Sequence, residues 1–201
     1  MQRIKSKNKE NSYFIGDLHI GHQNILKYDS ERFDFESIEE HNETILENCN
    51  SVLNENSDLY ILGDVFFGKK DVGYAENWIR RLKGNKYLIL GNHDQLIIFN
   101  NVLQKYFKRI DSYLEVEFNR QLVCLFHYPI AEWNKCHRSS WMLYGHLHDH
   151  YYPLMGYKTK CVSANKIDLK PISYQQLETY MSNKPVLTHH EVNDKKNMQS
   201  K

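Results

Sequence analysis

Hydrophobic residues gather in short runs along the chain, separated by longer polar stretches. The runs cover residues 13–15, 59–62, 87–90, 122–126 and 141–144. Within each run the apolar residues follow one another without polar alternation, which is typical of strands buried on both faces. The pattern therefore predicts five buried strands.

The stretches between the first runs have helical spacing. Apolar residues three, four and seven positions apart would share one helical face: Ile38, Ile45, Leu46, Cys49, Val52 and Leu53. A second helix is predicted to carry Val72, Ala75, Ile79 and Leu82, and a third to begin just after Asp94. Because strands alternate with helices, we expect an α/β domain with a mainly parallel central sheet.

The second half of the chain has a different pattern. Strand-like segments follow each other from residue 110 to 126 and again from 141 to 162, across polar turns such as Asn119-Arg120, which predicts antiparallel hairpins. A last helix is predicted over residues 174–181. Residues 1–11 and 186–201 are polar and lack periodicity, so we expect flexible ends around a single domain of residues 12–185.

Composition narrows the class of protein. A chain of 201 residues suits one domain with a substantial core. The formal charge is +1, so no overall charge excess directs it to nucleic acid or to a membrane. No stretch approaches the roughly 20 apolar residues of a membrane helix. We therefore expect a cytoplasmic protein that does not bind membranes.

The cysteines are also consistent with a cytoplasmic protein, because they are widely spaced and form no C-x-x-C pair: Cys49, Cys124, Cys136 and Cys161. Such spacing favours reduced thiols. Cys124 and Cys161 lie in apolar runs and are expected in the core.

Each apolar run ends in, or just before, residues that bind metal ions. In chain order these are Gly16-Asp17-Leu18-His19, Gly63-Asp64, Gly91-Asn92-His93-Asp94, His127 and Gly145-His146-Leu147-His148. The carboxyl ends of strands in an open α/β sheet converge on one crevice, so a single site should collect them all. The glycine before four of these blocks would let the chain turn sharply and bring backbone close to the ions.

The mixture of ligand types points to catalysis. Carboxylates, imidazoles and an amide oxygen, without thiolate, suit Mn, Fe, Ni, Co or Zn. Seven ligands are too many for one catalytic ion with an open position, but they divide well between two. Two ions about 3.5–4 Å apart can hold a hydroxide and clamp the oxygens of a phosphoryl group. The sequence thus predicts a dinuclear phosphoester hydrolase.

The same blocks also carry a resemblance. D-x-H, G-D, G-N-H-D, a single His and G-H-x-H, in this order from Asp17 to His148, resemble the signature of the calcineurin-like metallophosphoesterase superfamily. Residues 17–25, His127-Tyr128-Pro129 with Trp133, and Tyr144-Gly145-His146 are similar to a group of small bacterial and phage phosphoesterases. The resemblance implies a four-layer α/β/β/α sandwich with mixed central sheets and a site that contains two divalent metal ions, with Mn²⁺ expected first.

The resemblance also implies a role for each site residue. One ion would be held by Asp17, His19 and His148, the other by Asn92, His127 and His146, with Asp64 bridging them. His93 would protonate the leaving oxygen or stabilise charge on the phosphoryl group. Asp94 would accept a hydrogen bond from the His93 imidazole and so fix its tautomer.

The implied reaction is hydrolysis of a phosphodiester or phosphomonoester by attack of metal-bound hydroxide. Gly63-Asp64-Val65-Phe66-Phe67-Gly68 departs from the G-D-x-V-D-R-G of protein phosphatases, and His93 stands where lipid A pathway hydrolases have Arg. Both departures argue against those substrates. The chain has no length for a large capping domain, so the site should be open, which favours diesters of nucleotides or nucleic acids. The alternative is a non-catalytic binding scaffold with this fold, against which the presence of Asp64 and His93 argues.

Residues beside the blocks leave alternatives open. His22 either contacts substrate phosphate or lies behind the ligands, and Arg32 is a second candidate contact to substrate phosphate. Trp133 is expected to pack its loop against the sheet, with stacking on a base as the alternative. Residues expected at the surface are His41, Lys69, Lys70, His150, His189 and His190.

Overall fold

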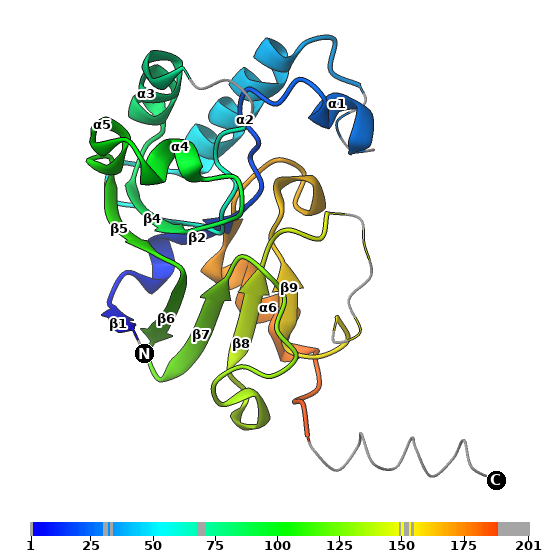
Figure 1. Cartoon of the computed structure of the whole chain (residues 1–201). Coiled ribbons are helices and arrows are strands. Elements are labelled where there is room, and N and C mark those ends of the chain that lie inside the picture. Colours follow the sequence, from blue (N-terminus) through cyan, green and yellow to red (C-terminus); the bar gives the residue numbers. More distant parts are fainter. Residues whose placement is uncertain are drawn as a thin grey trace, which may run out of the picture.

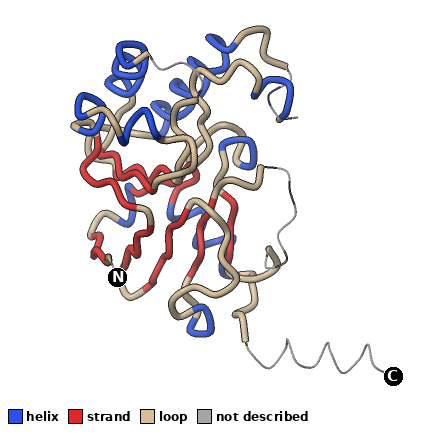
Figure 2. Tube along the Cα trace, in the orientation of Figure 1, coloured by secondary structure: helices blue, strands red, loops and turns tan. Residues whose placement is uncertain are grey.

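The computed structural model describes residues 2–29, 32, 34–67, 71–148, 150, 153 and 155–188. Two five-stranded sheets lie face to face, and most of the helices cover the outer face of one of them (Figures 1 and 2). The expected surface residues Lys69, Lys70, His189 and His190, and most of the expected flexible tail, lie outside the described residues.

The first sheet carries the strands of the chain's first half. Its order is β10 (Ile172–Ser173), β2 (Ser12–Ile15), β3 (Asp58–Ile61), β4 (Asn85–Ile89) and β5 (Phe107–Asp111). Strands β2 to β5 are parallel, and β10 pairs antiparallel with β2. The mainly parallel arrangement expected for this half is confirmed.

The second sheet has the order β1 (Arg3–Ser6), β6 (Tyr113–Phe118), β7 (Gln121–Phe126), β8 (Trp141–Tyr144) and β9 (Thr159–Cys161). The hairpin predicted around Asn119-Arg120 is present as the antiparallel pair β6–β7. The hairpin predicted from residue 141 to 162 is wrong, because β7, β8 and β9 all pair in parallel. β8 ends at Tyr144 and β9 begins at Thr159, a separation in sequence long enough for the crossover that parallel neighbours need.

The N-terminal segment also differs from expectation. Instead of a flexible arm, β1 pairs in parallel with β6, and a 3-10 helix follows at Lys9–Asn11. The Arg3 guanidinium contacts the buried Glu115 carboxylate at 2.7 Å. Backbone pairing along a sheet edge places no demand on side-chain hydrophobicity, so a polar sequence can form this strand.

The predicted helices are present. They are α2 (Ile38–Val52), α3 (Val72–Arg81), α4 (Gln95–Ile98) and α6 (Tyr174–Ser182), with two further short helices at α1 (Ile25–Tyr28) and α5 (Asn101–Gln104). The Ser37 hydroxyl accepts the Glu40 amide at 3.1 Å, and the Asp71 carboxylate accepts the Tyr74 amide at 3.1 Å. Both side chains satisfy backbone donors that a helix start leaves without partners.

The apolar residues form layers. One cluster lies between the first sheet and the helices, with Ile61 and Trp78 among its members, and a second fills the space between the sheets around Phe14 and Val123. A third covers the outer face of the second sheet, where Trp133 is 4% exposed and packs as predicted. The expected α/β fold with two mixed sheets is confirmed.

All four cysteines are buried free thiols, as expected for Cys124 and Cys161. None of the helices in the described ranges is long and apolar enough to cross a membrane.

Candidate metal centre

The strand ends of both sheets meet at one place. β2 leads to Asp17, β3 to Asp64, and β7 to His127 in the other sheet, and these three side chains offer ligand atoms within 4.8 Å of one another. All three residues are buried. Three of the predicted metal-binding residues, which come from separate blocks of the sequence, therefore lie together as expected.

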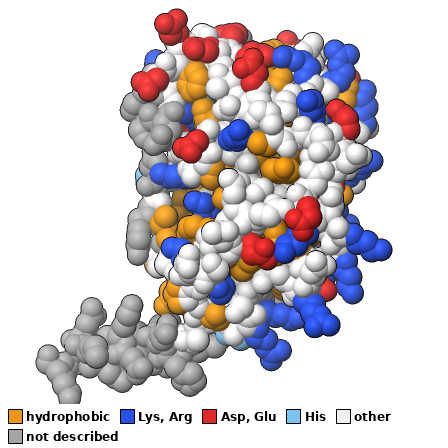
Figure 3. Space-filling view, turned by 180° about the vertical axis from the view of Figure 1, so that it is seen from behind, with side chains coloured by type: hydrophobic (Ala, Val, Ile, Leu, Met, Phe, Trp, Pro, Cys, Tyr) orange, Lys and Arg blue, Asp and Glu red, His pale blue; other side chains and the backbone are white. Residues whose placement is uncertain are grey.

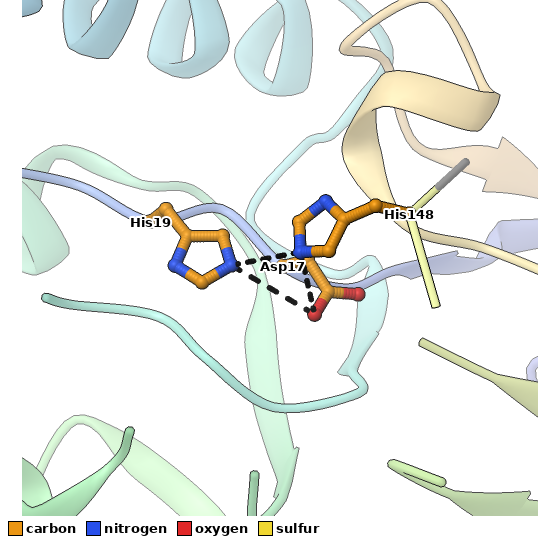
Figure 4. A group of neighbouring side chains, drawn as sticks. All are labelled: Asp17, His19 and His148. Carbon is orange, nitrogen blue, oxygen red and sulfur yellow. Dashed lines mark hydrogen bonds and ion pairs between the residues drawn. The ribbon is translucent and has the colours of Figure 1, made fainter. Parts of the chain in front are cut away.

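A second group shares Asp17. The Asp17 Oδ1 atom lies 4.0 Å from His19 Nε2 and 4.0 Å from His148 Nε2, and the two imidazole nitrogens are 3.3 Å apart (Figure 4). The two rings and the carboxylate face a common point, as ligands around one ion do. Asp17, His19 and His148 come from two different sheets.

The second carboxylate, Asp64 of the first group, also approaches His19 of the second group. Asp64 Oδ2 is 3.9 Å from His19 Nε2 and 3.7 Å from His127 Nε2. Asn92 Oδ1 lies 3.0 Å from the same His127 nitrogen. The His146 ring centroid is 5.1 Å from that of His127, although His146 belongs to neither compact group.

The backbone at these residues takes an unusual conformation. Asp17, His19, Asp64, His146 and His148 all have positive φ angles, between 46° and 68°. Side-chain-bearing residues adopt this region rarely, and such strain persists only where the surroundings impose it. The strain turns each side chain off its strand end and into the shared site.

Two of the glycines that precede the metal-binding blocks are needed for a reason other than the expected approach of backbone to metal. A Cβ at Gly91 would collide with the Asp64 carboxylate, and a Cβ at Gly145 would collide with the Asp17 carboxylate. These glycines therefore leave room for ligand side chains that come from another strand.

Hydrogen bonds away from the site fix the ligand orientations. His127 Nδ1 lies 2.8 Å from the Leu62 carbonyl, and His148 Nδ1 lies 3.4 Å from Asp29 Oδ2. Both contacts place the proton on Nδ1 and leave Nε2 as the free electron-pair donor. Asp17 Oδ2 accepts the Ser163 hydroxyl at 2.6 Å, which directs Oδ1 to the two histidines.

The chemistry of the donor set fits divalent cations. Burial raises the pKa of Asp64 above its usual value, and burial lowers the pKa of His19 well below the usual value. A neutral imidazole at His19 beside the buried carboxylates of Asp17 and Asp64 offers the nitrogen and oxygen donors that a divalent ion binds. The buried Asp/His clusters are consistent with a two-metal site.

Asp94 does not have the predicted role. Its buried carboxylate accepts the backbone amides of Asp64 at 3.0 Å, Val65 at 2.9 Å and Gly91 at 2.8 Å. Burial raises its pKa to about 6. Through these amides Asp94 ties the β3 and β4 loops together, and in the described part of the chain its carboxylate makes no hydrogen bond to the His93 ring.

Arg32 is also placed differently from the prediction. Its side chain is 0% exposed, and its guanidinium donates to the carbonyls of Asp17 at 2.7 Å and Leu18 at 3.1 Å. It also pairs with Asp29 at 2.9 Å, the residue that holds His148. Arg32 therefore supports the ligands from behind and is not positioned to contact substrate.

His41, expected at the surface, is fully buried against Arg32. An Arg32 Nη1 donor lies 3.0 Å from His41 Nε2, and His41 Nδ1 lies 3.1 Å from Asn42 Oδ1. Burial lowers the pKa of His41 to about 4. A polar residue on a predicted helix reads as exposed unless its partner, here a buried arginine from another segment, is known.

His22 and His93 flank one aromatic ring. The Phe67 ring lies 3.7 Å from the His22 centroid and 4.3 Å from that of His93, and His19 lies 5.4 Å and 6.0 Å from the same two rings. Burial lowers the pKa of His22 to about 4. Both imidazoles are half-buried at the edge of the ligand cluster. His150 is exposed, as expected.

Sequence reasoning missed four residues that act on the site: Asp29, Phe67, Tyr128 and Ser163. Tyr128 donates its hydroxyl to Asn92 Oδ1 at 3.3 Å, and its ring lies 4.5 Å from the His146 ring centroid. Its position next to His127 in the sequence could have indicated that Tyr128 lies at the site. Asp29 and Ser163 carry no signal in the sequence, because their importance depends on contacts with residues more than a hundred positions away.

Fold and site define a two-sheet α/β protein whose buried Asp/His cluster can hold metal ions. Residues 12–197 match the Metallophos family, calcineurin-like phosphoesterase, and the chain belongs to this family. The superfamily expected from the sequence blocks is confirmed.

Two relatives and one solved structure illustrate the range of similar proteins. The chain is 30% identical to "Uncharacterized protein MJ1445" of Methanocaldococcus jannaschii over 166 residues, which cover 80% of this chain and 85% of that protein. It is 39% identical to "Gene 66 protein" of Mycobacterium phage L5 over 85 residues, 42% of this chain and 40% of that protein. A crystal structure of AQ665 from Aquifex aeolicus, a protein of unknown function, superposes with a TM-score of 0.64 at 26% identity, covering 84% of this chain and 98% of the other.

Proposed function

We propose that this protein is a metal-dependent phosphoesterase that hydrolyses a phosphodiester or phosphomonoester, with a preference for diesters of nucleotides or nucleic acids. The observation that carries the proposal is the position of Asp64 between two ligand groups, with Oδ2 3.9 Å from His19 and 3.7 Å from His127. A carboxylate shared by two groups is what a two-metal hydrolytic site requires.

The short distances within each set support a division of the ligands, and Asp17 also offers an atom within 4.8 Å of Asp64 and His127. Asp17, His19 and His148 would hold one ion, and Asn92, His127 and His146 the other, with Asp64 shared. The donor set suits Mn²⁺ first and Fe, Ni, Co or Zn as alternatives, because it mixes carboxylate, imidazole and amide without thiolate. Two such ions would activate water for attack and neutralise the charge of the phosphoryl group.

His93 is the candidate acid. Its backbone amide donates to Asp64 Oδ1 at 2.9 Å, which anchors the residue at the shared carboxylate. Its ring stands edge-on to Phe67, with an interplanar angle of 83°, and belongs to neither ligand group. An imidazole held beside the ligands but outside them is suited to give a proton to the leaving oxygen.

Tyr128 supports a nucleotide diester as substrate. It is 36% exposed, and its ring packs 4.9 Å from the His127 centroid. An exposed aromatic face next to the ligands offers a stacking surface for a base. We further propose that the protein acts in the cytoplasm, where its four buried thiols would stay reduced.

A metal panel tests the proposal. The metal-free protein is supplied with Mn²⁺, Fe²⁺, Ni²⁺, Co²⁺ or Zn²⁺ and assayed with bis(p-nitrophenyl) phosphate and p-nitrophenyl phosphate. We expect turnover that requires added metal and is fastest with Mn²⁺ on the diester. Absence of turnover with every ion, in a sample whose folding is verified by circular dichroism, would overturn the enzyme and leave a binding scaffold.

A further inference from the structure

A cavity of about 90 Å³ opens beside the metal centre, at the edge strand β9. The residues that line it include His148, Lys160, Lys166 and Tyr180, together with apolar side chains such as Leu147 and Met155. A single water needs roughly 10–15 Å³ of such space, so the cavity can take a group of several heavy atoms. Because His148 also faces Asp17, the cavity begins where the ligand cluster ends.

Two lysines, Lys160 and Lys166, line this cavity, and Lys184 lies beside its Tyr180. The Lys160 and Lys184 ammonium groups lie 4.9 Å and 4.8 Å from the centroid of the same Tyr180 ring. The pKa of Lys160 is lowered by burial and by the charges of Lys184 and Lys166, while Cys161 and the Asp168 carboxylate act in the opposite direction. Among the described residues that line the cavity there is no Asp or Glu. Like charges held together in this way favour a bound anion.

The lysines continue beyond the first cavity. Lys160 and Lys166 also line an adjoining cavity of about 310 Å³, which adds Lys170 and one acidic residue, Asp168. In the view from behind, Lys and Arg side chains lie among Asp and Glu side chains near the top of the molecule and gather more densely along its lower edge (Figure 3). The whole chain carries a formal charge of only +1, so its positive charge is unevenly distributed.

We propose that this lysine pocket, formed by Lys160, Lys166 and Lys184 around Tyr180, binds a second phosphate group of a substrate whose scissile phosphate lies at the metal centre. The inference rests on the proposed function and names the class of substrate: a nucleotide or oligonucleotide with a phosphate next to the diester that is cut. Lysine offers a mobile point charge with three donors, which suits a phosphate at varied approach angles. Tyr180 carries two of the ammonium groups and so fixes where the charge lies.

The test compares two dinucleotides that differ in one phosphate. TpT contains only the scissile diester, and pTpT adds a terminal 5′-phosphate. The variants are Lys166→Gln and the double variant Lys166→Gln/Lys184→Gln, which spare the more buried Lys160. Lys108→Gln, at an exposed position of β5 on the far edge of the first sheet from β10, is the matched control for loss of charge.

We expect the wild-type protein to favour pTpT over TpT in kcat/KM. The double variant should reduce the ratio of the two values roughly tenfold, mainly through KM for pTpT, and the control should change it less than twofold. An equal fall for both dinucleotides, or a ratio that matches the control, would overturn the pocket. TpTp, which carries its extra phosphate at the 3′ end, tests whether the pocket binds the other end of the substrate. If the wild-type protein prefers TpTp and the double variant loses that preference, the pocket is supported and the strand runs in the opposite direction.

A binding measurement distinguishes failure of the lysine pocket from failure of the proposed enzymatic function. If the wild-type protein cleaves neither dinucleotide nor bis(p-nitrophenyl) phosphate, the enzyme has failed, and fluorescence anisotropy with labelled pTpT and TpT still measures the pocket. Weaker binding of pTpT alone in the double variant supports the pocket, whereas equal binding of pTpT by wild-type and double variant overturns it.

Discussion

The two ligand groups of the metal centre are supported in different ways. Around Asp64 and His127 the supports come from adjacent strand ends: the Leu62 carbonyl orients His127, and the Asp94 carboxylate gathers the amides of Asp64, Val65 and Gly91. Around Asp17 and His148 the supports are side chains from distant segments, namely Asp29, Arg32 and Ser163.

The two ligand groups therefore depend on different parts of the fold. Asp64 is held by the turns that end β3 and β4, and His127 joins it from β7 of the other sheet through the Leu62 carbonyl. Asp17 and His148 depend instead on the side chains of Asp29, Arg32 and Ser163. Buried networks of charged side chains are sensitive to the loss of any member, because the remaining partners stay buried.

Removal of the shared carboxylate should have the largest effect. Asp64→Ala takes away a ligand atom within 4 Å of both His19 and His127, so both ions should bind more weakly and the rate should fall by more than the 10–100-fold typical of outer partners. Metal content after dialysis and kcat on bis(p-nitrophenyl) phosphate measure the two losses. Retention of two ions per chain would refute the shared role.

His93→Ala should separate rate from metal binding. A positioned general acid contributes about 10²–10⁴ in rate, and His93 belongs to neither ligand group, so the rate should fall by that factor while both ions stay bound. Metal analysis and kcat with a poor leaving group, such as a thymidine diester, provide the measurement. Loss of metal with unchanged turnover per bound pair would show that His93 is a ligand.

Asp29→Asn and Asp94→Asn should each weaken metal binding at a different one of the two ligand groups. Asp29→Asn removes the acceptor of His148 Nδ1 and the partner of Arg32, so the ion of the Asp17 group should bind about 10–100-fold more weakly. Asp94→Asn disturbs three backbone hydrogen bonds and should weaken the ion of the Asp64 group instead.

Calorimetric titration with Mn²⁺ resolves the two binding steps. Asp34→Asn, at an exposed position, is the control for the loss of a carboxylate. If both variants weaken the same step, the contrast between the two groups is wrong.

The smallest expected effect concerns pH. His41 has its pKa lowered to about 4 by burial and by Arg32, against about 6.5 in an unfolded chain. Between these values the unfolded chain binds a proton that the folded protein does not. The stability is therefore full above pH 6.5 and falls as the pH drops toward 4, by on the order of 3 kcal/mol.

Urea unfolding of the metal-free protein at pH 7, 6 and 5 measures this slope. His41→Gln keeps an acceptor for Arg32 and should lose less stability on acidification than the wild type does. Parallel pH curves for the two proteins would contradict the assignment.

The blocks of metal-binding residues and the five buried strands were readable from the sequence. Asp17 and Asp64 follow neighbouring parallel strands of one sheet, so they could be placed together without a structure. His127 follows a strand of the other sheet, and its place beside them depends on how the two sheets pack. The helix over Ile38–Val52 was equally legible, because one apolar face repeats along it.

Other features depended on distant contacts. Arg32 was predicted to contact substrate and His41 to lie at the surface, but each is the other's buried partner. Asp94 stands next to His93 in the chain, yet its carboxylate accepts amides from the end of β3 and from Gly91 in its own loop. The direction of β9 followed from pairing with β8 after a long crossover, and a strand's pattern of apolar residues is the same in either direction.

The sequence by itself determined the ligand chemistry, the strands that deliver it and the family, since these depend on residue type and local order. Only the tertiary structure decided which residues support the two ligand groups and where a lysine pocket adjoins them. The physical reason is that a buried hydrogen bond or a gathering of like charges is made by residues far apart in the chain, and no local pattern records their distance in space.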